Sequence, residues 1–280
     1  MKYGITLPYG DARVVADLAQ EAEAAGWDGV FVGDAIWCID PMIQLAAAAM
    51  TTTTIKLGTM VLAVPLRIPW HLASESNAID HLSDGRMILG LGTGATWMGW
   101  HAFPDVPTDI YTRAEMLDET IDILTELYQR KQFDYDGKHY HLKLTQLDTM
   151  HYPPRPVQQP RIPLWVVGAW PRKKSMQRIL KADGLLPMKI NAEGKFIDVQ
   201  PADLREMKAY IDANRVPRDH APTTPFDYVI EGKTAGLSKQ EAVDKLCPWA
   251  EAGMTWWIES AWGIEAEALR EVISQGPPHL

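Results

Sequence analysis

The sequence is poor in cysteine, in positive charge and in long apolar runs. Its two cysteines, Cys38 and Cys247, cannot build a disulfide framework or a four-cysteine zinc site. No apolar run approaches the roughly 20 residues of a membrane helix, and the N-terminus enters a strand-like segment without a signal-peptide core. Lys and Arg total 27 against 36 Asp and Glu, which leaves a net charge of −9 and argues against a broad nucleic-acid-binding surface. We therefore expect a cytoplasmic protein with neither nucleic acid nor membrane as a partner.

Short apolar runs alternate with amphipathic stretches along the 280 residues. The runs predict strands at Tyr3–Pro8, Gly29–Asp34, Ile55–Val64, Met87–Gly94, Pro163–Ala169, Gly184–Lys189, Phe226–Gly232 and Thr255–Trp262. Helices are predicted at Ala12–Ala25, Pro41–Met50, His71–Leu82, Arg113–Tyr128, Lys174–Lys181, Ala202–Asn214, Lys239–Ala252 and Glu265–Ser274. Asp11, Asp40, Thr112 and Ser238 are the expected N-terminal capping residues of four of them. Eight strand–helix units predict an α/β fold, a single (β/α)8 TIM barrel over residues 1–280.

The interval between strands four and five, residues 95–162, is much longer than the others. It contains the predicted helix Arg113–Tyr128, a hairpin signal at Asp136-Gly137 and a proline-rich connector. Long loops at the top of barrels act as lids in several classes of enzyme. The interval therefore predicts an insertion that serves as a lid, without naming the chemistry.

The carboxyl ends of the strands are where a barrel of this kind places its site. The side chains expected there are mostly apolar or aromatic, with few charges. Such a lining favours a flat conjugated ring over a sugar or a bare metal ion.

Two local patterns look like ligand-binding motifs, but the residues around them favour a simpler role. His139-Tyr140-His141 has the spacing of two zinc-binding imidazoles, yet it falls in a predicted hairpin without an evident third ligand, so a solvated hairpin face is the simpler interpretation. The run from Gly90 to Gly94 has the wrong spacing for a dinucleotide-binding turn. Its glycines would instead let a ligand ring approach the backbone. We expect no metal.

An anion site is predicted after strand five. Trp170-Pro171-Arg172-Lys173-Lys174-Ser175 follows a strand and opens a helix, so backbone N–H groups, three cations and a hydroxyl converge there. A phosphate is the simplest ligand for this arrangement, and a solvated helix start is the alternative.

Several motifs together resemble the bacterial luciferase-like family of flavin- and deazaflavin (F420)-dependent oxidoreductases. The longest lies between Leu57 and Gly94 and contains Ile79-Asp80-His81-Leu82-Ser83-Asp84-Gly85-Arg86. Further motifs are Ala22-Glu23-Ala24-Ala25-Gly26-Trp27-Asp28-Gly29, Arg113-Ala114-Glu115-Met116, Ile162-Pro163-Leu164-Trp165 and Ala250-Glu251-Ala252-Gly253. The resemblance covers nearly the whole chain.

The resemblance implies a (β/α)8 barrel that binds reduced FMN or coenzyme F420 at the strand ends. It implies that the ring rests on strand three at Met60 and Val61, near a non-proline cis peptide, beside Gly92, Thr93 and Gly94 of strand four. The family's phosphate site corresponds to Gly168, Ala169, Trp170, Arg172, Lys173, Lys174 and Ser175. Relatives are often homodimers, and the oxygenating members use flavin reduced by a separate reductase, so both partners are expected beside a small-molecule substrate.

Two positions depart from the family pattern. The histidine that many members carry after the acidic residue of strand two is absent, because Ala35-Ile36-Trp37 follows Asp34. The glutamate of some deazaflavin dehydrogenases after the strand-four glycines is absent as well. Asp34 is then the first candidate to carry protons, ahead of Glu259, Lys189 and His101, although Asp34 and Glu259 could simply satisfy backbone donors.

Three functions are compatible with these residues. The first is a luciferase-like monooxygenase that uses reduced FMN and O2 on a small hydrophobic or aromatic substrate. The second is an F420-dependent reductase or dehydrogenase that transfers hydride on the same site. The third, of another class, is a non-catalytic flavin-binding protein. A metal-dependent hydrolase on the same barrel lacks a set of ligands.

Overall fold

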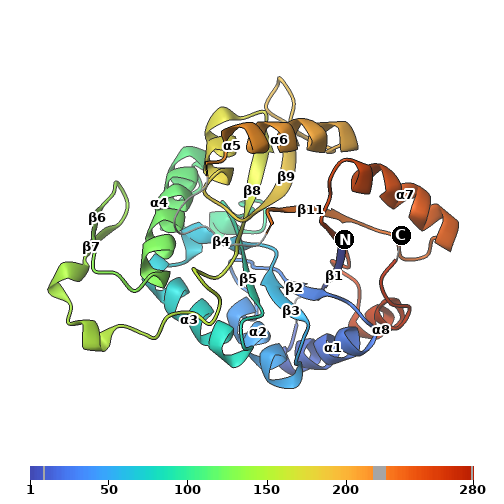
Figure 1. Cartoon of the computed structure of the whole chain (residues 1–280), viewed down its shortest axis with the longest axis horizontal. Coiled ribbons are helices and arrows are strands. Elements are labelled where there is room, and N and C mark those ends of the chain that lie inside the picture. Colours follow the sequence, from blue (N-terminus) through green and yellow to red (C-terminus); the bar gives the residue numbers. More distant parts are fainter. Residues whose placement is uncertain (9, 217–224, 279) are drawn as a thin grey trace.

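The computed structural model describes residues 1–8, 10–216, 225–278 and 280. Parallel strands form a closed barrel, because β1 pairs with both β2 and β12 (Figure 1). Around the barrel the strands are β1 (Lys2–Thr6), β2 (Gly29–Val32), β3 (Lys56–Thr59) with its continuation β4 (Leu62–Ala63), β5 (Met87–Gly92), β8 (Leu164–Trp170), β9 (Gly184–Ile190), β11 (Asp227–Gly232) and β12 (Trp256–Glu259). The predicted TIM barrel is confirmed, with one change: the third strand is broken in two at Met60 and Val61.

Helices surround the strands (Figure 1). They are α1 (Ala12–Ala24), α2 (Pro41–Thr51), α3 (Pro69–Leu82), α4 (Ile110–Tyr128), α5 (Lys173–Ile179), α6 (Pro201–Asn214), α7 (Lys239–Glu251) and α8 (Ala266–Ser274), with short 3-10 turns at Val64–Leu66, Trp100–Ala102, Leu144–Gln146 and Thr149–His151. The predicted caps Asp11, Asp40 and Ser238 are confirmed. The prediction of Thr112 as a cap is wrong, because the side chain of Asp109 accepts the Thr112 N–H and starts α4 earlier.

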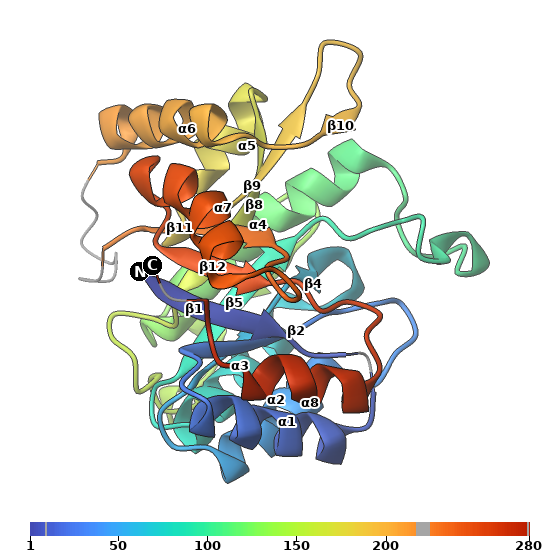
Figure 2. The same cartoon turned by 90° about the vertical axis from the view of Figure 1, so that its right-hand side faces the viewer.

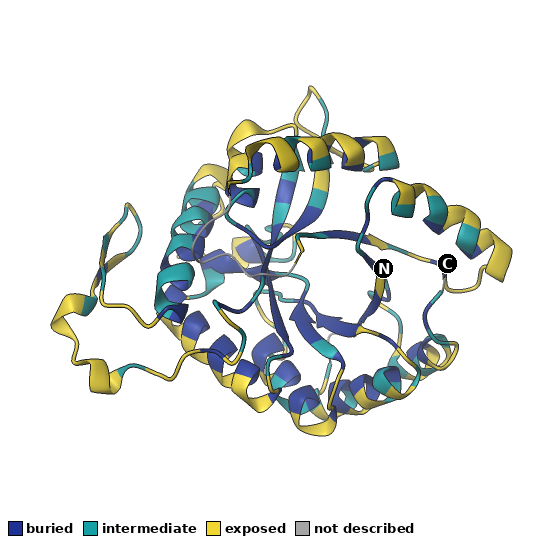
Figure 3. Cartoon of the chain, in the orientation of Figure 1, coloured by how far each residue is buried: buried dark blue, intermediate teal, exposed yellow. Residues whose placement is uncertain are grey.

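Two hydrophobic clusters lie on opposite faces of the barrel wall, because successive residues of a strand point to opposite sides. The lumen cluster, inside the barrel, consists of Phe31, Ile88, Trp165, Leu186, Val229, Trp256 and Ile258. Its rings pack closely, with the centroids of Phe31 and Trp165 5.3 Å apart. The outer layer, between strands and helices, holds most of the remaining buried apolar side chains, as the dark inner faces of the helices show (Figure 3).

The parts of the long interval between β5 and β8 lie in different places: some belong to the ring of helices, and one lies at the carboxyl ends of the strands. Its helix α4 packs beside α3 in the helical ring, as the fourth helix of an ordinary barrel does. The predicted hairpin exists as β6 (Asp134–Asp136) and β7 (His141–Lys143), but it lies outside α4, where Glu119 accepts the N–H groups of Lys138 and Tyr140 (Figure 1). Of the parts of this interval, the segment between β5 and α4 is the one that extends beyond the carboxyl ends of the strands (Figure 2).

Buried polar contacts tie the loops at the opposite, N-terminal end of the barrel. Asp84 and Gly85 both have positive φ, 52° and 79°, and this turn delivers Arg86 to the end of α2. The Arg86 guanidinium donates to the carbonyls of Ala49, Thr52 and Ile55 at 2.9–3.1 Å. At the same end, Arg161 and Asp183 form an ion pair at 2.9 Å in which both side chains are 4% exposed.

Glu23 of α1 holds the loop before β3. Desolvation alone would raise the pKa of its carboxyl group, but N–H donation from Ile55, Thr54 and Thr53 lowers that pKa to about 2. Because the folded pKa lies below the unfolded value of about 4.3, the stabilisation is complete above pH 4.3. It is lost as the pH falls towards 2.

Replacement of Glu23 by Gln is therefore expected to lower the unfolding free energy at pH 7, and the deficit is expected to shrink between about pH 4.3 and pH 2. Urea unfolding of both proteins across this range measures it. A deficit that stays constant with pH would contradict a role for the charged carboxylate. Glu251, exposed at the end of α7, offers the control substitution Glu251→Gln.

No helix in the described part of the chain is both long enough and apolar enough to cross a membrane.

Candidate active site

A cavity of about 650 Å³ opens at the carboxyl ends of the strands, where the barrel geometry predicts the site. Its volume is within the range of roughly 300–1,000 Å³ typical of small-molecule sites. Apolar side chains dominate its lining, which consists of Met60, Val61, Val167, Leu186, Pro187, Met188, Asp198, Val199, Val229, Ile230, Glu231, Gly232, Lys245, Trp249 and Trp257. The predicted contacts Met60 and Val61 thus lie in the cavity wall.

The third strand breaks at a cis peptide bond between Met60 and Val61, at the position that the family resemblance implied. Neighbouring β5 has no side chains where β3 and β4 approach it. A Cβ on Gly90 would collide with the Thr59 carbonyl oxygen, and one on Gly92 would lie 2.8 Å from Cγ2 of Val61. These glycines therefore make room for the third strand itself, which brings Val61 to the cavity.

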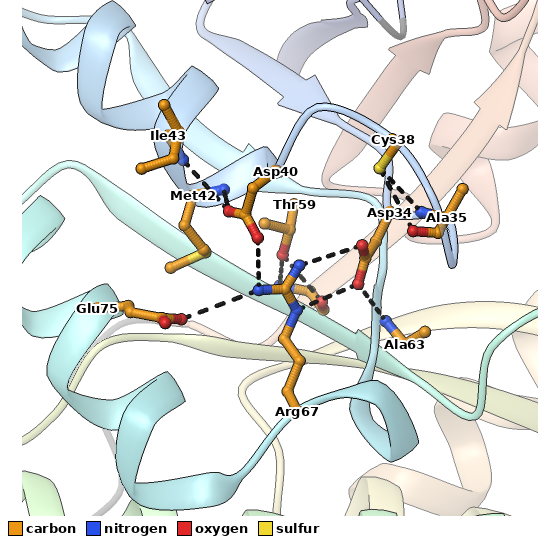
Figure 4. Close-up of polar contacts among 11 residues, drawn as sticks. Asp34, Ala35, Cys38, Asp40, Met42, Ile43, Thr59, Ala63, Arg67 and Glu75 are labelled. Carbon is orange, nitrogen blue, oxygen red and sulfur yellow. Dashed lines mark hydrogen bonds and ion pairs between the residues drawn. The ribbon is translucent and has the colours of Figure 1, made fainter. Parts of the chain in front are cut away.

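Asp34 is fully engaged at the end of β2 (Figure 4). Its carboxylate is 3% exposed and accepts two hydrogen bonds from the guanidinium of Arg67, at 3.1 and 3.2 Å. The same carboxylate accepts the Ala63 N–H at 3.1 Å, which fixes the chain two residues after Val61. Asp34 is thus placed to hold the third strand, and its part in proton transfer stays a prediction.

Arg67 links further carboxylates to this contact. It donates to Asp40 at 3.0 Å and lies 3.9 Å from Glu75 (Figure 4). Desolvation opposes its charge, but the hydrogen bonds to Asp34 and the nearby carboxylates prevail and raise the pKa of Arg67. The sequence motif contains Arg67 but did not predict a role for it. Arg67 lies two residues before the proline that starts α3, and nothing in the sequence pairs it with Asp34.

Glu259 at the end of β12 is 1% exposed and also engaged. Its oxygens accept the N–H groups of Thr234 and Ala235, the Thr234 hydroxyl and the Trp257 indole N–H, at 2.6–3.1 Å. These contacts fix the loop between β11 and α7. They match the alternative in which Glu259 satisfies donors at a strand end.

Thr93 and Gly94 continue β5 into the mouth of the barrel. Arg113 of α4 donates to both of their carbonyls, at 2.7 and 2.9 Å. Gly94 has φ +78°, and a Cβ there would collide with the Trp100 ring, which the Arg113 guanidinium covers from 5.5 Å. Arg113 was not predicted as a site residue, and it holds the start of the segment between β5 and α4 in place.

The predicted anion site lies at the end of β8 and the start of α5. The Ser175 hydroxyl accepts the Ala169 N–H at 2.9 Å, which leaves its own proton free to be donated. The first N–H groups of a helix have no acceptor within the helix. In α5 these are the N–H groups of Lys173, Lys174 and Ser175. Arg172, Lys173 and Lys174 are exposed. Gly168 and Trp170 belong to β8, whose last two residues pair with Met188 and Lys189 of β9. Of these two, Met188 lines the cavity.

The two histidines of the insertion hairpin point to different carboxylates. His139 contacts Glu115 at 3.0 Å, and His141 contacts Asp136 at 2.8 Å. In the described ranges, no three His, Cys, Asp or Glu side chains gather in a way that could hold a metal ion.

Residues 2–267 match the family model of the luciferase-like monooxygenases. The chain belongs to this family. It is therefore placed among oxidoreductases whose relatives include flavin-dependent monooxygenases and F420-dependent enzymes.

The relatives of this luciferase-like chain include proteins named as F420-dependent and proteins named as flavin-dependent enzymes. One relative, from Mycobacterium tuberculosis, bears the name "putative coenzyme F420-dependent oxidoreductase". It is 36% identical to this chain, and the match covers 52% of this chain and 42% of the relative. The oxygenase component of a flavin-dependent trigonelline monooxygenase from Acinetobacter baylyi is 26% identical over 55% of this chain and 42% of its own length. The matched segments span less than half of either relative.

The fold has full-length counterparts among solved structures. The coenzyme F420-dependent tetrahydromethanopterin reductase of Methanopyrus kandleri superposes with a TM-score of 0.71, covering 98% of both chains at 17% identity. At this identity the likeness establishes the shared barrel alone.

Proposed function

We propose that this luciferase-like protein is a monooxygenase that uses reduced FMN and O2 on a small hydrophobic or aromatic substrate. The observation that carries the proposal is the apolar cavity bounded by the break in the third strand at Met60 and Val61. Reduced FMN, when bound, would supply the electrons that activate O2. A separate reductase would deliver it, and a homodimer remains the expected assembly.

The residues present fit such a cofactor. Val61, Val167 and Val229 would bound the ring with apolar surface, which excludes water from the reacting centre. The Ser175 hydroxyl and the first N–H groups of α5 would bind the phosphate. Asp34 would keep β4 in register through Ala63, and residues 95–109 would act as the lid.

A second candidate is an F420-dependent reductase or dehydrogenase. The exposed cations Arg172, Lys173 and Lys174 favour it, because they could pair with a longer anionic tail. On this alternative the bound deazaflavin would supply or accept hydride, and the apolar walls would play the same part.

Anaerobic calorimetry of the protein with reduced FMN and with reduced F420 separates these proposals. Tighter binding of FMN supports the monooxygenase, and tighter binding of F420 supports hydride transfer. Flavin that binds without any donor-dependent turnover would support the non-catalytic alternative. Failure of both ligands to bind at high micromolar concentration would overturn the proposed function.

The substitution Ser175→Ala tests the phosphate site. It removes one hydrogen bond to a charged group, so we expect FMN affinity to fall by roughly 10- to 100-fold. Riboflavin, which lacks the phosphate, should bind both proteins equally. Ser274→Ala, on the exposed face of α8, is the matched control. An equal loss of riboflavin and FMN affinity would show that Ser175 supports the strand end rather than the phosphate.

A further inference from the structure

Glu231 points from β11 into the mouth of the barrel. Successive residues of a strand face opposite sides of a sheet, and Val229, two residues before Glu231, belongs to the lumen cluster. Glu231 also stands beside Ile258 in the register of β11 and β12, and Ile258 is a residue of the lumen cluster as well. The carboxylate of Glu231 therefore lies on the lumen face, one step nearer the mouth than Val229, and it lines the cavity.

Trp262 fixes one oxygen of this carboxylate. Its indole N–H donates to Oε1 of Glu231 at 2.6 Å. The loop that carries Trp262 is itself anchored, because the N–H of the preceding residue, Ala261, donates to the Thr6 hydroxyl at 2.7 Å. The carboxylate is thus oriented before a ligand arrives, which lowers the entropic cost of binding.

The second oxygen of Glu231 has no such partner. Among the described residues, Trp262 is the only group that donates to this side chain, and no Lys or Arg forms an ion pair with it. Asp34 and Glu259, which also lie at strand ends, accept hydrogen bonds from the chain's own donors at both of their oxygens. Of these three carboxylates, Glu231 is the one that keeps an oxygen for a ligand.

The charges around this carboxylate favour a cation. The cavity lining contains a second carboxylate, that of Asp198, which directly follows the short strand β10 (Phe196–Ile197). It also contains the ammonium of Lys245, which donates to the backbone carbonyl of Lys233 at 2.7 Å. Two carboxylates against one ammonium leave the lining with a net negative charge, so a cationic ligand is attracted and an anionic one is repelled.

We propose that Glu231 selects a substrate whose apolar or aromatic body carries a cationic nitrogen, and that this nitrogen pairs with the second carboxylate oxygen. The indole ring of Trp249 in the same lining suits such a ligand, because tryptophan rings attract cations to their faces. The inference rests on the proposed function, in which the cofactor ring lies beside Met60 and Val61. It adds a positive charge to the expected small hydrophobic or aromatic substrate.

Calorimetry with 1-methylpyridinium and with toluene tests this inference, because the two molecules have the same shape and differ in charge. Glu231→Gln keeps an oxygen for the Trp262 N–H but removes the charge. The affinity for 1-methylpyridinium should then fall about fivefold, as for an exposed ion pair, while the affinity for toluene stays the same. Glu231→Lys should weaken the cation further and strengthen the binding of benzoate.

Glu206→Gln removes the same charge from the exposed face of α6, outside the cavity lining, and is the matched control. The inference is overturned if Glu231→Gln, shown by circular dichroism to be folded, lowers the affinity for 1-methylpyridinium no more than this control does. It is also overturned if Asp198→Asn causes the loss and Glu231→Gln does not.

Binding of the cofactor separates this inference from the proposed function. If Glu231→Gln weakens reduced FMN as much as it weakens 1-methylpyridinium, the carboxylate serves the cofactor and the inference fails. If neither reduced FMN nor reduced F420 binds the unmodified protein but Glu231→Gln still lowers the affinity for the cation, the proposed function fails and the cation site stands.

Discussion

Replacement of Arg86 by Met is expected to lower the unfolding free energy by about 3–5 kcal/mol, the range for removal of a buried, fully bonded charge. The guanidinium is 6% exposed and caps the last carbonyls of α2 as well as the loop before β3. Methionine fills a similar volume but leaves those carbonyls without donors in a buried place. Helix α2 should therefore lose its fixed end.

Thermal and urea unfolding measure the effect, and the midpoint temperature should fall by about 10 °C. Arg86→Lys keeps the charge but has only three donors on a single nitrogen, so an intermediate loss is expected. Arg205→Met, on the exposed face of α6, is the matched control and should change stability little. A Met variant as stable as this control would show that water replaces the lost donors.

Replacement of Asp34 by Ala is expected to abolish turnover while the cofactor still binds. If Asp34 carries a proton, the turnover rate should fall by about 10²- to 10⁴-fold. The measurement is the rate at which bound reduced cofactor is oxidised in rapid mixing with an accepted substrate. Unchanged turnover would remove Asp34 from the reaction altogether.

Arg67→Lys tells proton transfer from positioning. Lysine keeps the positive charge but cannot bond both Asp34 oxygens in the planar geometry of the guanidinium. If Asp34 holds the third strand, Arg67→Lys and Asp34→Asn should both slow turnover and weaken cofactor binding. If Asp34 carries the proton, only Asp34→Asn should be severe, and only it should change the pH dependence of the rate.

The sequence predicted the barrel because each strand–helix unit has its own signals, such as the proline and aspartate that start α2. It could not predict the break of the third strand from periodicity, since Ile55–Val64 is mostly apolar and has no signal that would end a strand at Met60. The family resemblance supplied Met60 and Val61. The Asp136-Gly137 signal located the insertion hairpin in the sequence, but the sequence did not predict that the hairpin lies outside α4. The contacts of Glu119 with Lys138 and Tyr140 depend on how α4 presents its outer face.

For the carboxylates at the strand ends, too, the position was predicted from the sequence and the partners were not. Position along a strand placed Asp34 and Glu259 at the carboxyl end of the barrel, where both are found. Their partners Arg67 and Thr234 lie 33 and 25 residues away in the chain. Which donors reach a buried carboxylate is decided by loop packing, and a single sequence carries no signal for that.

The polar contacts of Glu23, Arg86 and Asp183 all lie at the N-terminal end of the barrel, whereas the cavity lies at the other end. These three sets of contacts are therefore separate from the loops around the cavity. In evolutionary terms, the loops around the cavity can diversify without disturbing them, provided that Asp34, Arg113 and Glu259 keep their own partners. The same separation makes residues 95–109 and the cavity lining suitable targets for directed evolution towards new substrates.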